Sequence, residues 1–447
     1  MMKTNARRVV ADILYNVYKN GAYLNEEIKS LRVKSNIDDI DFRFVNEITS
    51  GVLKNKLRID YIISKNTNIK FKKISLYILA ILESAVYQIV FMDKVPSSAA
   101  VNEAVKLTKT RNLSKSSGFV NGVLRSVERT YTTIEYPKNK NEYLSVYYSI
   151  PLWLVDRWIN EFGEDRAQNI IMAMNQKPDL FFRANTLKTN ADELVILLNN
   201  SGCDTIVYNN PKCPTINYLA LCNSVNDITS LDCYKEGLFY IQDFASALTV
   251  EIMDVHPGMT VIDMCAAPGG KTTHMAEKMK NKGTIYAFDM YEHKINKIKE
   301  NAIRLGIDII DAQVSDSTIN KPELNGTADR VLVDAPCSGL GIIRRKPDIK
   351  YARSSEDLYA LAQTGYSILE NAKNYVKTGG SIIYSTCTIE KCENDDVTDK
   401  FLQNNKNFEK QIIAEYDKQN NGSITLYPDT DNCDGFYICK LKKICEL

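Results

Sequence analysis

The sequence is poor in histidine and has no long hydrophobic run. Its three histidines are scattered at positions 256, 274 and 293, and none of its 11 cysteines belongs to a C-x-x-C pair. Protein zinc sites use clustered cysteines and histidines, so the sequence predicts no metal site. No apolar segment approaches the roughly 18 residues that a membrane-spanning helix needs, and we expect no membrane anchor.

The cysteines do not follow a secretory signal. The first residues, MMKTNARRVVADILYNV, place charged side chains where such a signal has its apolar segment. We therefore expect reduced thiols in the cytoplasm and not a disulfide framework.

Charge is balanced over the whole chain but not along it. The net charge of the 447 residues is +1. Residues 1–131 carry 22 Lys+Arg against 12 Asp+Glu, a net charge of +10, and the remainder carries 34 against 43, a net charge of −9. A basic amino-terminal part favours contact with a polyanion such as RNA, although a merely solvated helical surface would show the same bias.

The stretch TVIDMCAAPGGK at 260–271 organises the carboxyl-terminal part. It predicts a buried strand that breaks into a turn of small residues and opens a helix at Lys271. In an open α/β sheet, such a strand end and helix start meet around a ligand, and glycine lets the backbone approach that ligand closely. The turn residues are Ala266, Ala267, Pro268, Gly269 and Gly270.

Three ligands compete for this turn. The dinucleotide fingerprint G-x-G-x-x-G is absent. A P-loop stays open, because Gly270, Lys271 and Thr272 match its end. Its first glycine, however, is replaced by Cys265, whose side chain should prevent an anion nest from closing. S-adenosylmethionine (SAM) needs a carboxylate for its ribose, and Asp289 ends the next predicted strand 19 residues after Gly270, where that acid is expected.

Strands and helices alternate through the rest of this part. Further strands are predicted at 309–314, 330–334 and 380–386, and a helix with apolar residues at helical spacing is predicted between 295 and 305. This alternation predicts a mostly parallel, doubly wound α/β sheet. The tail at 434–443 is predicted to close the sheet as an antiparallel edge strand.

Four motifs resemble those of one enzyme family. They are AAPGGKT at 266–272, DAPCSGLG at 334–341, RRKPDIK at 344–350 and STC at 385–387. Together they are similar to the RNA cytosine-5 methyltransferases that use SAM, and in particular to the bacterial RsmB (Sun/Fmu) branch, which modifies small-subunit ribosomal RNA. DAPCSG with a downstream STC is a specific combination, whereas GGKT alone is a weak signal.

The resemblance spans nearly the whole chain and implies its domains. Residues 1–131 would form an all-α, NusB-like RNA-binding bundle, and 132–143 a linker. Residues 144–236 would hold helices and a small RRM-like α/β subdomain, and 237–447 a Rossmann-like class I SAM methyltransferase domain. A nearly continuous apolar run at 76–92 predicts the buried central helix of the bundle.

The resemblance also implies a chemistry for two cysteines. C5 of cytosine is too weak a nucleophile to take a methyl group unaided, but a thiolate that adds to C6 activates it. By resemblance Cys387 is this nucleophile and Cys337 assists its release, although DNA-type enzymes place the nucleophile in the Pro-Cys position. Asp334 would bind the N3/N4 edge of the base, and Lys271 would support the site or cap neighbouring carbonyls. The expected product is a specific 16S ribosomal RNA cytosine methylated at C5, made by a monomeric enzyme.

The expected cofactor is SAM, without a metal. Asp263 ends its predicted strand and is expected either to lie near the amino group of the methionine part or to cap the next turn. The other expected cofactor contacts are Cys265, Ala266, Ala267, Pro268, Gly269, Gly270, Lys271, Asp289, Asp316 and Asp334.

Basic residues supply candidate contacts to RNA phosphates. Arg344, Arg345 and Lys346 are adjacent in a loop that precedes a helix with a predicted Ser354 capping box. For these three residues the alternative is a solvated surface. For Arg183 and Lys188 the alternative to an RNA contact is an internal salt bridge. The remaining candidates are Lys106, Lys109, Arg111, Lys115, Arg183 and Lys188.

Two other functions stay open at this point. The first is a P-loop ATPase or RNA helper, which would bind ATP and not SAM. The second is a non-catalytic RNA-binding ribosome-assembly factor with a vestigial pocket, against which the presence of Cys337, Cys387 and Asp334 argues.

Overall fold

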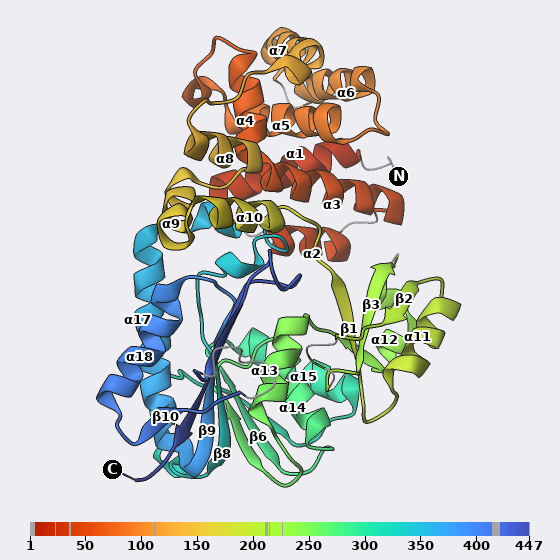
Figure 1. Ribbon diagram of the computed structural model, residues 1–447. Helices are drawn as coiled ribbons and strands as arrows, with labels where there is room; N and C mark the ends of the chain where they lie inside the picture. The colour runs from red at the N-terminus through yellow and green to blue at the C-terminus, as the bar shows by residue number, and fades with distance from the viewer. Residues whose placement is uncertain are drawn as a thin grey trace. The chain divides into compact units, whose positions relative to one another are not determined.

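The chain divides into two compact units (Figure 1). The computed structural model describes residues 5–22, 24–34, 37–110, 113–210, 213, 215–225, 227–413 and 421–446. The helical unit comprises Met1–Gln176 and Ile343–Ala352, and the α/β unit comprises Lys177–Ile342 and Arg353–Leu447. A short segment from the carboxyl-terminal half therefore folds with the helices of the amino-terminal half.

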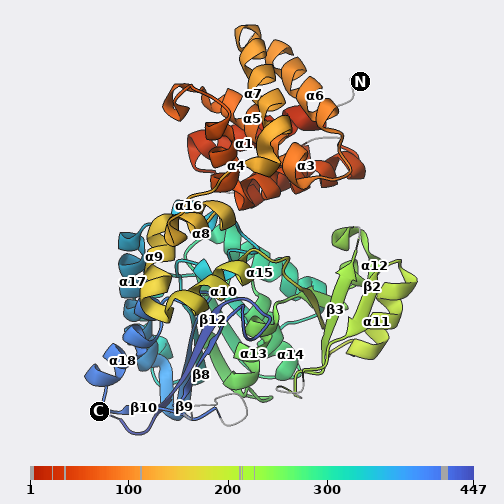
Figure 2. The ribbon, with the colours of Figure 1, turned by 45° about the horizontal axis from the view of Figure 1, so that its top comes forward.

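The helical unit is built around α5 (Leu76–Phe91), whose sequence is apolar on every face. All of its residues from Ile78 to Ile89 are buried, which confirms the central helix predicted for 76–92. Figure 2 shows α5 among α1, α3, α4, α6 and α7. The other helices of this unit are α1 (Ala6–Asn20), α2 (Leu24–Lys34), α3 (Asp39–Lys54), α4 (Lys56–Lys65), α6 (Ser97–Thr110), α7 (Ser117–Thr130), α8 (Lys140–Tyr148), α9 (Leu152–Phe162), α10 (Glu164–Met174) and α16 (Ile349–Ala352).

Basic side chains near the end of α6 reach solvent. Lys106, Lys109 and Lys115 are exposed, as a phosphate contact requires, whereas the fourth candidate, Arg111, lies outside the described residues. Their contact with RNA stays a prediction.

The segment Ile343–Ala352 is joined to the rest of the helical unit by two hydrogen bonds. Lys350 Nζ donates to the carbonyl of Lys54 at 2.9 Å, at the carboxyl end of α3, and Tyr351 Oη donates to the carbonyl of Ser149 at 3.2 Å. Lys350 is 1% exposed, and burial lowers its pKa to about 7. This lysine therefore acts as a C-terminal helix cap.

Burial in the same segment corrects one expectation. Arg344 is 7% exposed, so the prediction that three adjacent cations face RNA is wrong for it. Arg345 is half-buried and Lys346 is exposed. After the short α16, the long helix α17 (Ser355–Tyr375) begins with the predicted capping box, formed by Ser354 and Asp357.

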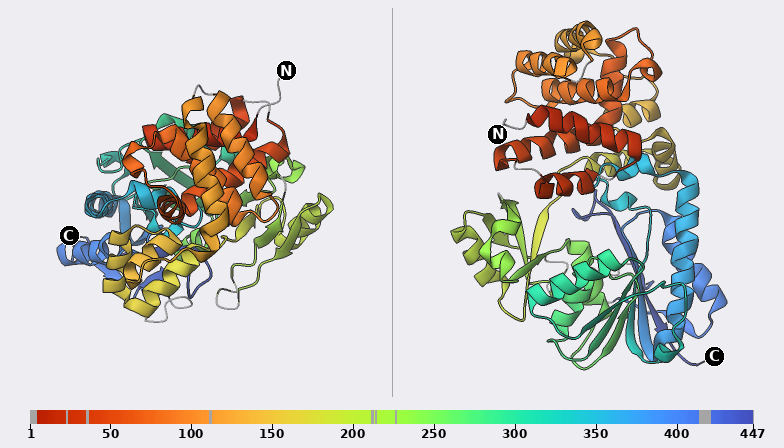
Figure 3. Two further views of the ribbon diagram at one scale, coloured as in Figure 1. Left: turned by 90° about the horizontal axis from the view of Figure 1, so that it is seen from above. Right: turned by 180° about the vertical axis from the view of Figure 1, so that it is seen from behind.

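The α/β unit contains a large sheet with helices on both faces (Figure 3). Its strand order is β10-β12-β9-β8-β5-β6-β7, with β11 also paired to β12, and the pairs from β9 to β7 are parallel. This confirms the doubly wound fold. The strands are β5 (Thr260–Asp263), β6 (Thr284–Asp289), β7 (Ile310–Val314), β8 (Ala328–Asp334), β9 (Val376–Thr386), β10 (Phe408–Lys410), β11 (Ser423–Leu426) and β12 (Phe436–Lys443), and the helices are α13 (Phe244–Met253), α14 (Gly270–Lys278), α15 (Glu292–Leu305), α17 (Ser355–Tyr375) and α18 (Asp395–Asn404).

Successive strand residues bury their side chains on opposite faces of this sheet. Val261 and Leu332 pack in the cluster that includes α13 and α14, whereas Ile262 and Val331 pack in the cluster that includes α17 and α18. Because both faces of the sheet are buried at its centre, the central strands β5 and β8 carry consecutive buried apolar residues, Val261 and Ile262 in β5 and Val331, Leu332 and Val333 in β8.

The tail strand β12 is not at the edge of the sheet, and that part of the sequence prediction is wrong. It pairs with β9 on one side and with β10 and β11 on the other. Nearly all of its side chains are buried, as in an interior strand. The two strands that cover it have only 3 and 4 residues, too few to show a period in the sequence.

A smaller antiparallel sheet precedes the large one in the sequence. Its strand order is β2-β3-β1-β4, and α11 packs its apolar residues on one face. β4 then leads directly into α13 of the large sheet. The elements are β1 (Leu180–Ala184), α11 (Ala191–Asn200), β2 (Asp204–Val207), β3 (Leu219–Ser224), α12 (Asp232–Lys235) and β4 (Phe239–Ile241).

Among the described residues, we find no helix that combines the length and the apolar character needed to cross a lipid bilayer.

Gly51→Ala should destabilise the helical unit, because α3 and α5 touch at this glycine. A Cβ added there would lie 2.0 Å from the ring of Tyr87, and relieving such an overlap costs about 1–3 kcal/mol. Hydrogen exchange measured on peptides from α3 and α5 should become faster. Gly122→Ala in α7, where a Cβ would meet nothing within 4 Å, is the control and should leave exchange unchanged or slower. Equal behaviour of the two variants would contradict this packing.

Candidate functional site

Three neighbouring parallel strands end at one edge of the large sheet. β5 ends at Asp263, β8 at Asp334 and β9 at Thr386. β5 lies between β6 and β8, so the chain order reverses beside it. Open α/β sheets bind ligands in the crevice at such a reversal.

A cavity of ≈ 190 Å³ opens at this edge. The cavity has two walls. The first wall is the connection from β4 to α13, and the second is the turn from β5 to α14, with Asp334 contributed by β8. The lining residues are Tyr240, Ile241, Gln242, Asp243 and Ser246 from the first wall, Asp263, Cys265, Ala266, Ala267, Pro268, Gly270 and Lys271 from the second, and Asp334.

Most of the predicted cofactor contacts are thus found in this lining. Gly269 itself is not among the lining residues, but its φ of 98° gives the turn its left-handed step. A Cβ at Gly270 would lie 3.0 Å from the ring of Tyr240. The small residues of the turn therefore keep the two walls of the cavity close together.

The two predicted reactive cysteines lie side by side. Strand pairing aligns Asp334 with Ser385, so the chain that follows each strand leaves the sheet at the same level. The Sγ atoms of Cys337 and Cys387 are 3.3 Å apart. The hydrogen bond between the two sulfurs, together with burial, holds the pKa of Cys337 well above its usual range, because a second negative charge beside the first is unfavourable.

Buried polar contacts hold the loop that carries Cys337. The backbone N–H of Ser338 donates to Glu393 Oε1 at 2.7 Å, and its hydroxyl donates to the other carboxylate oxygen at 2.5 Å. The N–H of Gly341 donates to the carbonyl of Cys387 at 3.0 Å. A Cβ at Gly341 would lie 2.0 Å from the carbonyl oxygen of Gly435, so only glycine allows this approach.

Asp334 is fixed through both of its carboxylate oxygens. Lys271 Nζ donates to Oδ2 at 2.7 Å and Ser385 Oγ donates to Oδ1 at 2.8 Å. The ammonium group of Lys271 also lies 5.1 Å from the centre of the Phe436 ring. This lysine, which a P-loop would offer to phosphate groups, is paired here with a carboxylate.

Asp263 carries a buried oxygen without a protein partner. Thr272 Oγ1 donates to Oδ2 at 2.7 Å, whereas Oδ1 is buried and has no hydrogen-bond partner. Burial raises the pKa of this carboxyl to about 7, against the smaller effect of the Thr272 hydrogen bond. A buried acceptor at the wall of a cavity is suited to a cationic or hydroxyl group of a ligand.

The other two predicted acids follow β6 and β7. Asp289 ends β6, is 8% exposed and lies 3.4 Å from Lys294 Nζ. Asp316 follows β7, and its Oδ1 accepts hydrogen bonds from the backbone N–H and the hydroxyl of Thr318, which lower its pKa. Neither acid lines the cavity, so both cofactor contacts stay predictions.

Several lining residues were not predicted from the sequence. Tyr240, Gln242 and Asp243 come from the short β4 and from the turn to α13, and the only signal there is an aspartate that could cap a helix. Ser385 is inside the STC motif, but its bond to Asp334 depends on strand register. No group of three metal-binding side chains suited to an ion is found within the part of the chain that the structure describes.

Comparison with known families identifies three domains in the chain. A family model described as 16S rRNA methyltransferase RsmB/F matches residues 250–442, and the NusB family matches residues 4–129. A third, the Methyltr_RsmF/B-like ferredoxin-like domain, matches residues 150–215. The chain belongs to the RsmB/F family of 16S rRNA methyltransferases.

Full-length relatives extend the match to nearly the whole chain. The probable ribosomal RNA small subunit methyltransferase B of Bacillus subtilis (strain 168) is 34% identical, over 99% of this chain and 100% of its own. The ribosomal RNA small subunit methyltransferase B of Photorhabdus laumondii is 31% identical, over 98% and 99%. The crystal structure of PH0851 superposes with a TM-score of 0.82 at 27% identity and covers 99% of this chain and 100% of its own.

The RsmB/F family accounts for both units of the chain. Its NusB and ferredoxin-like domains correspond to the helical bundle and the small sheet, and its methyltransferase domain to the large sheet. This confirms the fold class expected from the sequence and the activity of a small-subunit ribosomal RNA methyltransferase.

Asp263→Asn should change how stability depends on pH. The model-peptide pKa of aspartate is 3.8 and that of Asp263 in the folded protein is about 7. Between these two pKa values, Asp263 is protonated in the folded protein and ionised in the unfolded chain. The free energy of unfolding therefore falls as pH rises, by at most about 1.4 kcal/mol per pH unit. Relative to the wild type, the variant should gain unfolding free energy between pH 5 and pH 8, as measured by urea titration without cofactor.

Asp316→Asn is the control for this titration. The carboxyl group of Asp316 has a lowered pKa in the folded protein. Its contribution to the free energy of unfolding is therefore complete above the pKa that Asp316 has in the unfolded chain, and it is lost only in acid. The free energy of this variant relative to the wild type should be constant between pH 5 and pH 8. A flat profile for Asp263→Asn as well would show that Asp263 is ionised in the folded protein at pH 5.

Proposed function

We propose that this protein methylates C5 of a specific cytosine in 16S ribosomal RNA through a covalent cysteine–C6 intermediate, with SAM as methyl donor. The observation that carries the proposal is the pair of thiols, Cys337 and Cys387, 3.3 Å apart at the edge of the sheet. C5 methylation needs two groups at one base, one to add at C6 and one to help restore the ring. The target base must be single-stranded or flipped, since C6 is not accessible in a stack.

The cavity walls support SAM as the ligand. When bound, SAM supplies an electrophilic methyl group. The unpartnered Oδ1 of Asp263 suits the ammonium group of its methionine part, and the close backbone at Gly270 suits a ligand without phosphates. Asp289, at the end of β6, is proposed to bind the ribose hydroxyls and Asp316 the adenine amino group. The turn residues Cys265 to Gly270 would contact the ligand through their backbone.

The sulfur contact supports a division of roles between the cysteines. A raised pKa keeps the proton on Cys337, and a thiol hydrogen bond stabilises a thiolate at Cys387. Cys387 then adds through its sulfur to C6, and C5 becomes nucleophilic. Once the Cys387 sulfur is bonded to carbon it carries no charge, and Cys337 loses its proton to water. After methyl transfer, the Cys337 thiolate takes the proton from C5, the electrons of that bond re-form the C5–C6 double bond, and the bond from Cys387 to C6 breaks to release the Cys387 thiolate.

The clamp on Asp334 supports a role at the opposite edge of the base. Its carboxyl group is held between Lys271 and Ser385, so little reorganisation is needed when charge moves onto the ring. We propose that Asp334 binds the N3/N4 edge of cytosine and that Lys271 stabilises this arrangement electrostatically. A carboxyl group that binds N3 must carry a proton when it donates.

Each part of the chain has a proposed role in binding or modifying the RNA. The basic residues 1–131 would form the RNA-binding domain, followed by a linker predicted at 132–143, of which residues 140–143 lie in α8. Residues 144–236 would hold the helices and the RRM-like subdomain, and 237–447 the catalytic domain. The exposed lysines Lys106, Lys109 and Lys115 are suited to phosphate contacts.

Bisulfite sequencing of ribosomal RNA tests the reaction. A strain that lacks the protein should show one 16S cytosine that converts fully, and the wild-type gene should restore resistance of that cytosine. Cys387→Ala should not restore it, and Cys445→Ser, a change at an exposed cysteine of the tail, should. An unchanged bisulfite pattern together with a lost methyl group elsewhere in the 16S RNA would contradict C5 methylation.

Replacing each cysteine in turn tests the division of roles. Cys337→Ala should accumulate a covalent RNA–protein adduct in the presence of SAM, because Cys387 still adds to C6 while release is blocked. Cys387→Ala should form no adduct. Denaturing gel electrophoresis with labelled ribosomal RNA separates the adduct from free RNA. The opposite pattern would exchange the two roles.

A further inference from the structure

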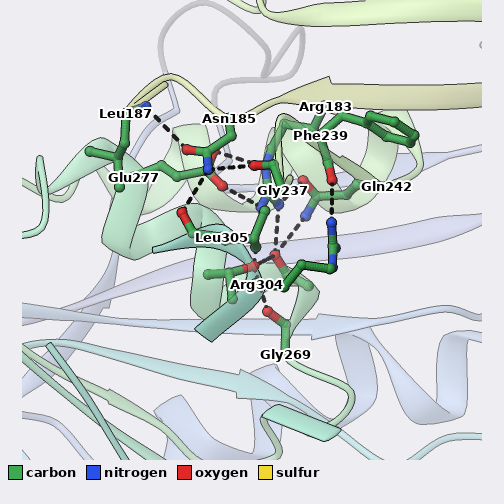
Figure 4. A network of polar contacts seen from close by, with 12 residues as sticks. Arg183, Asn185, Leu187, Gly237, Phe239, Gln242, Gly269, Glu277, Arg304 and Leu305 are labelled. Atoms are coloured by element: carbon green, nitrogen blue, oxygen red, sulfur yellow. Dashed lines mark hydrogen bonds and ion pairs between the residues drawn. The ribbon is translucent and has the colours of Figure 1, made fainter. Parts of the chain in front are cut away.

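A buried guanidinium, that of Arg183, lies within a network of polar contacts (Figure 4). Arg183 is in β1 of the small sheet, and its side chain has no exposed surface. It forms an ion pair with Glu277 of α14 at 2.7 Å, and the side chain of Glu277 is 1% exposed. Of the two readings that the sequence left open for Arg183, the structure therefore shows the internal salt bridge and not an RNA contact.

All five N–H donors of this guanidinium have an acceptor. Nε and Nη2 donate to the two oxygens of Glu277 at 3.1 Å and 2.7 Å, and Nη2 also donates to Thr273 Oγ1 at 3.1 Å. Nη1 donates to Gln242 Oε1 at 2.7 Å and to the carbonyl of Gly270 at 2.8 Å. Arginine is the only side chain with enough fixed donors to satisfy this set.

The acceptors of Nη1 belong to the two opposite walls of the cavity. Gln242 is part of the connection from β4 to α13, and Gly270 is part of the turn that opens α14; both line the cavity. β-sheet pairing aligns Arg183 with Tyr240, a third lining residue. The guanidinium carbon also lies 5.2 Å from the centre of the Tyr240 ring.

We propose that Arg183 is a positioning residue for the cofactor, which fixes the distance between the two walls of the cavity. Because the rigid guanidinium is bonded to both walls, it fixes their separation. SAM then binds to a pre-formed site and does not have to order it. The small sheet, in which the sequence offered Arg183 as an RNA contact, then helps to hold the SAM site in shape. This inference rests on the proposed function only for the identity of the ligand.

The test measures SAM binding by isothermal titration to the full chain carrying Arg183→Lys. Lysine keeps a positive charge beside Glu277, but its compact ammonium group cannot bond the carboxylate and both walls together. The Kd for SAM should rise roughly tenfold, as expected when about one or two hydrogen bonds are lost. In steady-state assays KM for SAM should rise by the same factor, and KM for ribosomal RNA should not change.

A paired variant guards against a folding defect. Arg183→Met with Glu277→Met removes both buried charges together, which leaves neither unpaired, and it should bind SAM as weakly as Arg183→Lys. The matched control is Lys188→Met. Lys188 joins the same two parts of the α/β unit, through the carbonyls of Glu236 and Arg304 at 2.8 Å and 3.1 Å, but is not in the cavity lining. Its loss should leave the Kd for SAM unchanged.

Two results would overturn the positioning role of Arg183. The first is a wild-type chain that binds SAM while both Arg183 variants bind it equally tightly. The second is an equal loss of affinity in Lys188→Met, which would make the effect one of general stability. A wild-type chain that does not bind SAM would instead contradict the proposed function and the ligand named here.

Discussion

The register between β8 and β9 is the constraint on which the site depends. It aligns Asp334 with Ser385, and the backbone N–H of Ala335 continues the ladder to the carbonyl of Ser385 at 2.8 Å. Both chains then leave the sheet beside each other, which brings the sulfurs of Cys337 and Cys387 to 3.3 Å. A shift of one residue in the pairing of a strand would turn all of its side chains to the other face of the sheet. The apolar side chains that must stay buried on each face therefore fix the register, and the register fixes the positions of the two cysteines.

Burial and an ion pair determine the charge of the ionisable groups at this edge of the sheet. Asp334 is ion-paired with Lys271, the thiol of Cys337 keeps its proton, and Asp263 has a pKa near 7 because it is buried with one oxygen free of partners. Buried groups with raised pKa values in one crevice are typical of functional sites. The small sheet contributes to the same crevice through Tyr240, and Gln242 follows its last strand, so the shape of the crevice and the fold of the subdomain are physically connected.

The fold and the position of the candidate site at the edge of the sheet could be predicted because their signals are local. The turn at 266–270, the strand-ending acids and the two cysteine motifs each occupy a few consecutive residues. What could not be predicted depends on contacts between distant segments. The interior position of β12 depends on two strands too short to show a period, the burial of Arg344 depends on a loop that folds with the helical unit, and the role of Arg183 depends on α14, 87 residues away at Gly270.

The most direct test of the account is to locate the covalent bond to the base. Transcribed 16S ribosomal RNA containing 5-fluorocytidine would be incubated with the wild-type protein and SAM, because fluorine at C5 cannot leave as a proton does. Digestion and peptide mass spectrometry then identify the modified cysteine. The account predicts a nucleotide attached to Cys387. Attachment to Cys337, or turnover of unmodified RNA with no trapped adduct, would contradict it.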